Sequence, residues 1–318
     1  MCATRILALV KYEPNGASSR VRFWNLRPGL EQKGFEIRML PLLGNEVLAR
    51  YYRERRHSYS TFIWAYLKRL KAILSVHPGT IVWVEKELMF ALPLRFEQIL
   101  GLDFRRCVFD YDDAVFLNYR DHGLGMLGRV GKFLYYARNA GHMTVGSDYL
   151  MEHMRKLGGT RLTKIPSTVF VERYRQRVHI ACSTTVIGWI GTPVTAQCLD
   201  TLKPVFITLA KKCAIQLKVI GAQWRCEGVD VVCLPWGEES EADMVSTFDI
   251  GIMPLPNDEW VKGKCGLKGL SYMALEVPTI MSAVGVNTDI IKDGENGFVA
   301  KTNEEWEEKL SQLIDSFD

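Results

Sequence analysis

The apolar residues of this chain gather in short runs that alternate with longer, mixed stretches. Arg5–Val10 (RILALV) is one such run, and the turn-forming residues PNGASS follow it. Four to eight apolar residues bounded by turn signals are typical of a strand buried on both faces. Runs of the same kind predict further strands at 35–42, 80–84, 107–110 and 142–145. A segment that starts at Ser147 and ends in two glycines predicts a capped helix.

The second half of the chain repeats this alternation. Strands that alternate with helices form parallel sheets covered on both faces. We therefore predict an α/β protein with two Rossmann-like domains, residues 1–172 and 173–318, whose ligands bind in a cleft beyond the carboxyl ends of the strands. The pattern predicts strands at 185–190, 215–220, 229–234, 249–254 and 278–282 and helices at 194–212, 238–247, 265–275, 287–291 and 303–317.

The length and composition agree with two folded domains. The chain has 318 residues, of which 47% are hydrophobic, and this excludes a disordered protein. No apolar run approaches the roughly 18 residues that cross a bilayer, and we expect no signal peptide. The eight cysteines are scattered without a CxxC pair, which argues against a zinc site or disulfides and favours a cytoplasmic location.

The charge is unevenly divided between the two halves. Residues 1–177 carry 29 basic and 16 acidic side chains, a net charge of +13, whereas residues 178–318 carry 11 and 20, a net charge of −9. This asymmetry suggests that the two halves face different partners. A basic half fits an anionic membrane surface or a polyanionic substrate better than it fits nucleic-acid binding by the whole protein.

Residues 49–74 are the most distinctive segment in composition. They hold seven Lys and Arg and one Glu, interleaved with six aromatic residues. Basic residues attract anionic head groups, and Tyr and Trp suit the lipid–water boundary, so the segment predicts peripheral membrane binding. A solvated helix that packs its aromatic residues into its own core is the alternative. Nucleic-acid binding has no supporting motif elsewhere in the chain.

Small and polar residues follow the first predicted strand. Gly16, Ala17 and Ser18 allow a ligand to approach the backbone, and Arg20 stands in the helix that follows them. The amide groups at a helix start suit an anion, although an ordinary turn with a serine cap accounts for the same residues. The chain has no GxGxxG after a strand, which disfavours a nicotinamide dehydrogenase.

Charged residues end the third and fourth predicted strands. Lys86 in VEKE is a candidate phosphate ligand, and the alternative is a solvated helix start. Asp110, Asp112 and Asp113 lie within four residues and repel one another unless a cation, a sugar or arginines offset their charge. We expect Asp112 or Asp113 to face the cleft. No other spacing supports a metal site.

Two segments of the second half suit a diphosphate. Gly191 and Thr192 form a small, polar turn after the strand at 185–190. Lys262, Lys264 and Lys268 lie near a predicted helix start, where lysine charge and the helix dipole both favour an anion. Lys264 and Lys268 would share one helix face if the helix included both.

The second half closely resembles retaining glycosyltransferases of family four, which have the two-Rossmann GT-B fold. The resemblance rests on Trp236 with its neighbouring glutamates, FDIGIMPLPNDEWVKGKCGLKGLSYMA and PTIMSAVGVNTDIIKDGENGFVA. ASSRVR, VEKEL, FDYDDA and GSDYLMEHM in the first half match a branch of that family. The resemblance implies transfer of a sugar from a nucleotide sugar to a glycan, glycolipid or other acceptor in surface polysaccharide or related biosynthesis.

The resemblance also implies roles for single residues. Lys264 and Lys268 would stabilise the leaving phosphate, and Asp112 and Asp113 would orient the acceptor. No cofactor other than the donor substrate and no metal is implied. The residues expected to bind substrate are Gly16, Ala17, Ser18, Arg20, Lys86, Gly191, Thr192, Trp236, Gly266, Ser271 and Gly285.

The sequence departs from the family's commoner pattern at several positions. Gly263 and Ser271 stand where two glutamates are usual, and Glu276 stands where a glycine is usual. The arginine and lysine that usually follow the first turn of the second domain are missing, and Lys264 and Lys268 can replace their charge. The replaced acidic pair keeps open a protein that binds a nucleotide or a glycan without transfer. A sugar-nucleotide epimerase of similar fold is the second alternative.

Overall fold

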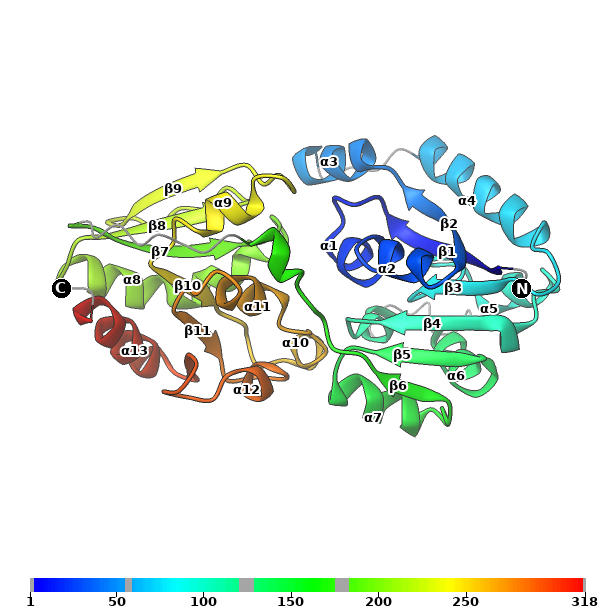
Figure 1. Cartoon of the computed structure of the whole chain (residues 1–318). Helices are drawn as coiled ribbons and strands as arrows, with labels where there is room; N and C mark the ends of the chain where they lie inside the picture. Colours follow the sequence, from blue (N-terminus) through cyan, green and yellow to red (C-terminus); the bar gives the residue numbers. More distant parts are fainter. Residues whose placement is uncertain (1–2, 55–58, 120–128, 175–182, 317–318) are drawn as a thin grey trace. The chain divides into compact units, whose positions relative to one another are not determined.

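The chain forms two compact units, Met1–Ser167 and Thr168–Asp318. The boundary between them lies shortly before the predicted boundary at 172/173. The computed structural model describes residues 3–54, 59–119, 129–174 and 183–316. Each unit contains one six-stranded parallel sheet. Figure 1 shows the N-terminal unit in blue to green and the C-terminal unit in green to red.

The N-terminal sheet has the strand order β2-β1-β3-β4-β5-β6. Its five longer strands confirm the predicted ones, and the three-residue β6 adds an edge strand that has no apolar run. The strands are β1 (Thr4–Tyr12), β2 (Phe35–Leu43), β3 (Ile81–Glu85), β4 (Cys107–Tyr111), β5 (His142–Val145) and β6 (Leu162–Lys164).

The helices of this unit connect consecutive parallel strands. The helix after β1 begins as α1 (Ala17–Ser19) and continues as a π-helix over Arg20–Trp24. The predicted cap at Ser147 is confirmed, because its hydroxyl accepts the amide hydrogen of Leu150. The other helices are α2 (Arg27–Gln32), α3 (Asn45–Glu54), α4 (Tyr59–Leu74), α5 (Leu94–Gln98), α6 (Arg129–Asn139) and α7 (Asp148–Lys156).

The C-terminal sheet has the strand order β12-β11-β10-β7-β8-β9. Its core gathers apolar residues of β7, β8, β10 and the flanking helices, with Trp189, Phe206 and Trp306 among the largest. The strands are β7 (Thr185–Ile190), β8 (Ile215–Ile220), β9 (Asp230–Leu234), β10 (Ile250–Met253), β11 (Thr279–Ser282) and β12 (Phe298–Ala300).

The predicted helix at 194–212 is wrong in detail. A 3-10 helix over Ala196–Leu202 leads into α8 (Lys203–Ala210), because Pro204 has no amide hydrogen and fits only the first turn of an α-helix. The remaining helices are α9 (Glu241–Val245), α10 (Glu259–Lys262), α11 (Leu267–Met273), α12 (Asn287–Ile290) and α13 (Asn303–Asp315). Within the described residues, no helix is both long enough and apolar enough to span a bilayer.

Candidate functional site

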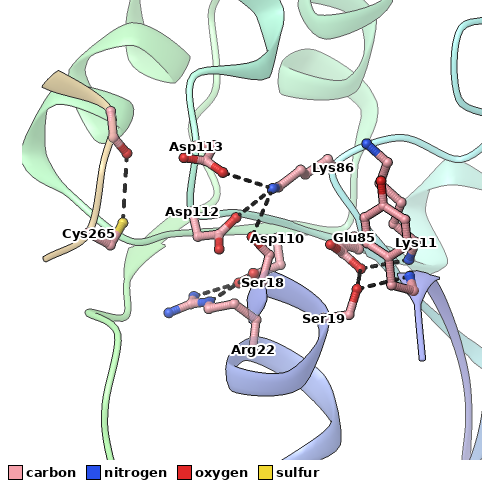
Figure 2. A network of polar contacts seen from close by, with 12 residues as sticks. Lys11, Ser18, Ser19, Arg22, Glu85, Lys86, Asp110, Asp112, Asp113 and Cys265 are labelled. Atoms are coloured by element: carbon pink, nitrogen blue, oxygen red, sulfur yellow. Dashed lines mark hydrogen bonds and ion pairs between the residues drawn. The ribbon is translucent and has the colours of Figure 1, made fainter. Parts of the chain in front are cut away.

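Lys86 is the centre of a polar network at the carboxyl edge of the N-terminal sheet. Its ammonium lies 2.9 Å from Asp112 and 3.2 Å from Asp113, and it donates a hydrogen bond to the Ser18 hydroxyl at 3.2 Å (Figure 2). Burial alone would lower the pKa of Lys86, but Asp112 and Asp113 raise it well above its usual value. The predicted repulsion among the carboxylates of DYDD is therefore offset by a lysine that directly follows the neighbouring strand β3.

The loop after β3 holds Lys86 in an uncommon conformation. Lys86 has a φ of 62°, in the left-handed region that non-glycine residues rarely occupy. Buried and half-buried side chains bind the backbone of this loop and keep it in place. Lys132 donates to the carbonyls of Met89 and Leu92, Arg69 to that of Leu88 and Tyr66 to that of Phe90, whereas Glu97 accepts the amide hydrogen of Met89.

Asp110 has its own cation. Arg22 binds both oxygens of its carboxylate, at 2.6 and 2.9 Å, with both side chains buried. The same guanidinium donates to the carbonyls of Ile165 and Pro166, which follow β6. Arg22 thus fixes the chain that leaves the N-terminal sheet, and Asp110 has a structural partner rather than a free carboxylate.

Glu85 is a buried carboxylate beside this network. One of its oxygens accepts the Ser19 hydroxyl and the amide of Lys11, and the other has no hydrogen-bond partner among the described residues. Burial raises the pKa of Glu85, and the nearby Lys86 opposes that shift. The side chain of Lys11 lies over the ring of Phe90 at 5.1 Å, and burial together with Lys86 lowers its pKa.

The loop after β1 is shaped by close contacts. A Cβ at Gly16 would lie 2.4 Å from the Tyr12 side chain, so the backbone can pass there only as glycine. Arg20 is mostly buried and donates to the carbonyl of Pro14, which closes the loop. Ala17 is exposed and Ser18 half-buried. The hydroxyl of Ser18 connects this loop to the ammonium of Lys86.

Lys268 is the central cation of the C-terminal site. Its ammonium lies 4.0 Å from the centre of the Trp189 ring and 3.5 Å from the Thr195 hydroxyl. Burial, with a smaller effect of Lys264, lowers the pKa of Lys268 to about 7. A Cβ at Gly191 would lie only 2.6 Å from the ammonium, so the small turn and the cation belong to one site. Thr192 supports that turn, because its amide donates to the Thr195 hydroxyl.

Lys264 and Lys268 do not share a helix face. Gly266, with a φ of 71°, is the N-cap of α11, so Lys264 lies in the turn that precedes the helix and only Lys268 lies in it. The left-handed glycine separates α10 from α11 and corrects the predicted helix at 265–275. Lys264 lies 5.6 Å from the ring of Trp260, and Gly285 passes close to the backbone of Lys262.

Trp236 and Ser271 are connected through Glu241 and Tyr174. Glu241 accepts hydrogen bonds from the indole of Trp236 at 2.7 Å and from the hydroxyl of Tyr174 at 3.4 Å. The oxygen of the same Tyr174 hydroxyl lies 3.3 Å from the hydroxyl oxygen of Ser271, which is buried. Ser271 stands where the family pattern has a glutamate. The carboxylate of Glu241 is connected to this serine through the Tyr174 hydroxyl.

The structure thus brings the predicted residues into two groups, one at the edge of each sheet. The N-terminal group contains Ser18, Lys86, Asp112 and Asp113, and the C-terminal group contains Gly191, Thr192 and Lys268. Sequence reasoning misses Trp189, because a tryptophan in an apolar strand reads as core. It also misses Thr195 and Glu241, because a threonine or a glutamate indicates a binding site only when its hydrogen-bond partners, here Lys268 and Trp236, are known.

The described residues contain no group of three or more His, Cys, Asp or Glu side chains that could hold a metal ion. The carboxylates at the carboxyl edge of the N-terminal sheet are instead paired with Lys86 and Arg22. Independence from metal ions stays a prediction.

Comparison with known proteins decides the class of the C-terminal unit. Residues 184–316 match the family model of glycosyl transferases group 1. The C-terminal unit carries a glycosyltransferase domain. This match confirms the predicted glycosyltransferase for that unit, whereas the finer assignment to family four stays a prediction. A comparison with curated protein sequences gives no match.

Solved structures confirm the predicted GT-B fold over nearly the whole chain. Sucrose-phosphate synthase from Thermosynechococcus elongatus has a TM-score of 0.69 at 14% identity, over 99% of this chain and 90% of the other. WaaG, a glycosyltransferase involved in lipopolysaccharide biosynthesis, has a TM-score of 0.68 at 16% identity, over 98% and 90%. HepE from Anabaena, solved with UDP and glucose, has a TM-score of 0.60 at 13% identity, over 98% and 90%.

Proposed function

We propose that this glycosyltransferase moves a sugar from a nucleotide-sugar donor to a glycan, glycolipid or related acceptor, with retention of the anomeric configuration. The observation that carries the proposal is the ammonium of Lys268, held on the Trp189 ring beside the Gly191 turn. The glycosyltransferase domain over 184–316 and the UDP and glucose bound by the structurally similar HepE support a nucleotide-sugar donor.

The chemistry of transfer suits this cation. A nucleotide sugar leaves a diphosphate on which negative charge grows in the transition state, and a fixed positive group stabilises that charge more than it stabilises the ground state. One such donor lowers the activation barrier by about 3–4 kcal/mol. Lys268, with Lys264 near it, is proposed to hold the leaving diphosphate.

The acceptor is proposed to bind at the edge of the N-terminal sheet. Asp112 and Asp113 accept charge-assisted bonds from Lys86 and retain lone pairs for sugar hydroxyls. In a front-face reaction with retention, the leaving phosphate oxygen takes the proton of the attacking hydroxyl. No protein nucleophile is then required, and these carboxylates orient the acceptor.

Glu241 is proposed to take over the part of the missing glutamate at 271. Its carboxylate lies beside Ser271 through Tyr174, and it can accept a hydroxyl of the donor's ribose. Glu241→Gln keeps the size of the side chain and removes its charge. We expect about tenfold weaker nucleoside diphosphate binding, whereas the exposed Glu239→Gln leaves binding unchanged.

A screen of nucleoside diphosphates by thermal shift tests the donor site. A selective ligand stabilises the folded state by mass action, and we expect this shift to disappear in Lys264→Ala and Lys268→Ala but to persist in Lys292→Ala, which removes an exposed lysine. Absence of a shift with every nucleoside diphosphate would contradict the proposal.

The two replaced glutamates favour one competing function, a protein that binds a nucleotide sugar without transferring it. Release of nucleoside diphosphate with a panel of donors and acceptors separates the two. A transferase releases it only when an acceptor is present, an epimerase releases it without one, and a binding protein shows a thermal shift and no release.

The free cysteines support a reducing, cytoplasmic setting for the reaction. The six cysteines within the described residues are free thiols. Structural disulfides are typical of exported proteins and rare in the cytosol. The cytoplasmic location is part of the proposal.

A further inference from the structure

Helix α4 exposes a continuous apolar stripe. The side chains of Ile63, Trp64, Leu67 and Leu74 are 59%, 73%, 49% and 62% exposed. Their spacing places them along one side of a helix. Leu67, Leu70, Lys71, Leu74 and Ser75 line a hollow of about 400 Å³ along this stripe. A large tryptophan that is three-quarters exposed is unusual on a protein surface that meets only water.

The other side of α4 belongs to the protein core. Phe62 packs against Leu42 and Leu43 at the end of β2, and Tyr66 donates to the carbonyl of Phe90. Arg69 is buried and donates to the carbonyls of Val10 and Leu88. These side chains pack toward the core, so the part of the predicted segment that can meet a membrane is limited to the opposite face of the helix.

The first part of the predicted segment 49–74 belongs to α3. Tyr51 and Tyr52 of this helix are half-buried, and their ring centres are 6.0 Å apart. Arg55, Arg56 and the side chain of Tyr59 lie outside the described residues. The apolar stripe and the lysines beside it all lie within 60–75.

The charge on this face has one sign. Lys68 and Lys71 are exposed beside the apolar stripe, and the sequence from Tyr59 to Ser75 contains no Asp or Glu. In Figure 1, α4 (cyan) lies along the N-terminal sheet beside β2. The helix thus offers apolar side chains, an aromatic side chain suited to a lipid–water boundary and cations without carboxylates.

We propose that this face of α4 docks on an anionic lipid bilayer. The helix lies in the plane of the interface, with Ile63, Trp64, Leu67 and Leu74 among the upper acyl chains and the two lysines on the head groups. A second copy of the chain fits less well, because a two-fold contact through this face would bring the lysines of both copies together. The proposal is independent of the glycosyl transfer proposed above.

Binding of the full chain to sedimented vesicles tests the proposal. One set of vesicles is pure phosphatidylcholine, and the other contains about a third phosphatidylglycerol. We expect at least tenfold stronger partitioning into the anionic set and a loss of binding as salt is raised. Equal partitioning into both sets, or none into either, overturns the proposal.

Two double variants locate the contact. Trp64→Ser with Leu67→Ser is expected to reduce partitioning at least tenfold. Phe96→Ser with Ile99→Ser is the control, because these side chains of the α5 region are 55% and 78% exposed on the same unit and lie outside the stripe. Equal losses in both double variants, or none in the first, would mean that another surface binds the vesicles and would overturn the assignment to α4.

The lysines are tested separately. Lys68→Glu with Lys71→Glu replaces attraction by repulsion, and removal of a cation from an anionic surface costs roughly fivefold in binding per residue. We expect more than twentyfold weaker binding to anionic vesicles and little change with neutral ones. An unchanged preference for anionic vesicles overturns the assignment of the lysines.

Two further measurements separate this inference from other outcomes. Brominated lipids are expected to quench tryptophan fluorescence in the parent, and Trp64→Phe should remove most of that quenching. A dimer that forms without lipid and dissociates in Trp64→Ser/Leu67→Ser would assign the face to a second copy and overturn the proposal. The thermal shift with nucleoside diphosphate is expected to be intact in every α4 variant, so failure of vesicle binding leaves the donor proposal unaffected.

Discussion

The ammonium of Lys268 lies 4.0 Å from the centre of the Trp189 indole ring. The negative face of the ring attracts a cation, but the same surroundings reduce its hydration and penalise the charge. The penalty is the larger effect, because the pKa of Lys268 falls from 10.5 to about 7. An anion placed beside the ammonium reverses this shift, and binding of a diphosphate is therefore coupled to the uptake of a proton.

This coupling predicts a pH-dependent affinity. Below pH 7 Lys268 is charged in the free protein, and above it the amine must be protonated as the anion binds. We expect the Kd for a nucleoside diphosphate to rise from pH 7 to 9, by up to about tenfold per pH unit. Calorimetry in buffers of different ionisation enthalpy measures the proton taken up. We expect Lys268→Met to lose most of the binding at every pH, and binding with an equally steep profile in that variant would contradict the assignment.

Gly191→Ala tests the closeness of the turn to the cation. The added Cβ would lie 2.6 Å from the Lys268 ammonium and 2.5 Å from the Trp189 ring, so one of them must move. We expect nucleoside diphosphate affinity to fall at least tenfold while the fold is kept. Gly29→Ala is the matched control, because its Cβ meets nothing within 4 Å. Isothermal titration measures both, and parent-like affinity in the Gly191 variant would refute the arrangement.

Lys132→Met tests the support of the Lys86 loop. Lys132 is fully buried and pairs with Glu87 at 3.0 Å and Glu97 at 2.8 Å. Its removal leaves two buried carboxylates without their cation, which costs about 3–5 kcal/mol of unfolding free energy. Urea unfolding of the N-terminal unit measures this loss. Lys156→Met breaks an exposed pair with Glu152, and we expect it to leave the free energy of unfolding nearly unchanged.

Glu276→Gly is expected to stabilise the protein. Glu276 has a φ of 57°, in the region where a side chain is strained and glycine is not. The residue is exposed, so its side chain contributes little packing. We expect about 1 kcal/mol of added stability, seen as a higher Tm. The neighbouring exchange Ala274→Gly, at a helical φ of −65°, should have the opposite sign.

The same φ bears on one departure of the sequence from the family pattern. The resemblance implies a glycine at this position, and glycine adopts a left-handed φ without strain. A sequence pattern can identify such a position, but the backbone angle shows what the substitution costs.

Most strands could be predicted, because few structures other than a buried strand place a short apolar run between turn residues. The pattern misses β6 and β12, since three residues with one or no buried side chain give no signal. It also misses α10 and begins the next helix at 265, before the cap at Gly266. Gly266 reads equally well as a helix residue or a cap until its φ of 71° is known.

The chemistry of the site was only partly predictable. The crowding of Asp110, Asp112 and Asp113 required cations, and Lys86 was a candidate from its place at a strand end. Arg22 could not be paired with Asp110, because the two residues are 88 positions apart and only the register of the sheet brings them together. The segment at 49–74 belongs partly to α3 and partly to α4, and the sequence alone could not show this division. Composition gives the number of basic and aromatic side chains, but the packing of the helices decides which of them face outward.

Each six-stranded sheet takes all its strands from one continuous half of the sequence. A genetic crossover near codon 168 would therefore exchange a complete unit without cutting a strand ladder in either half. The two halves can therefore be exchanged as separate modules, each with a complete sheet.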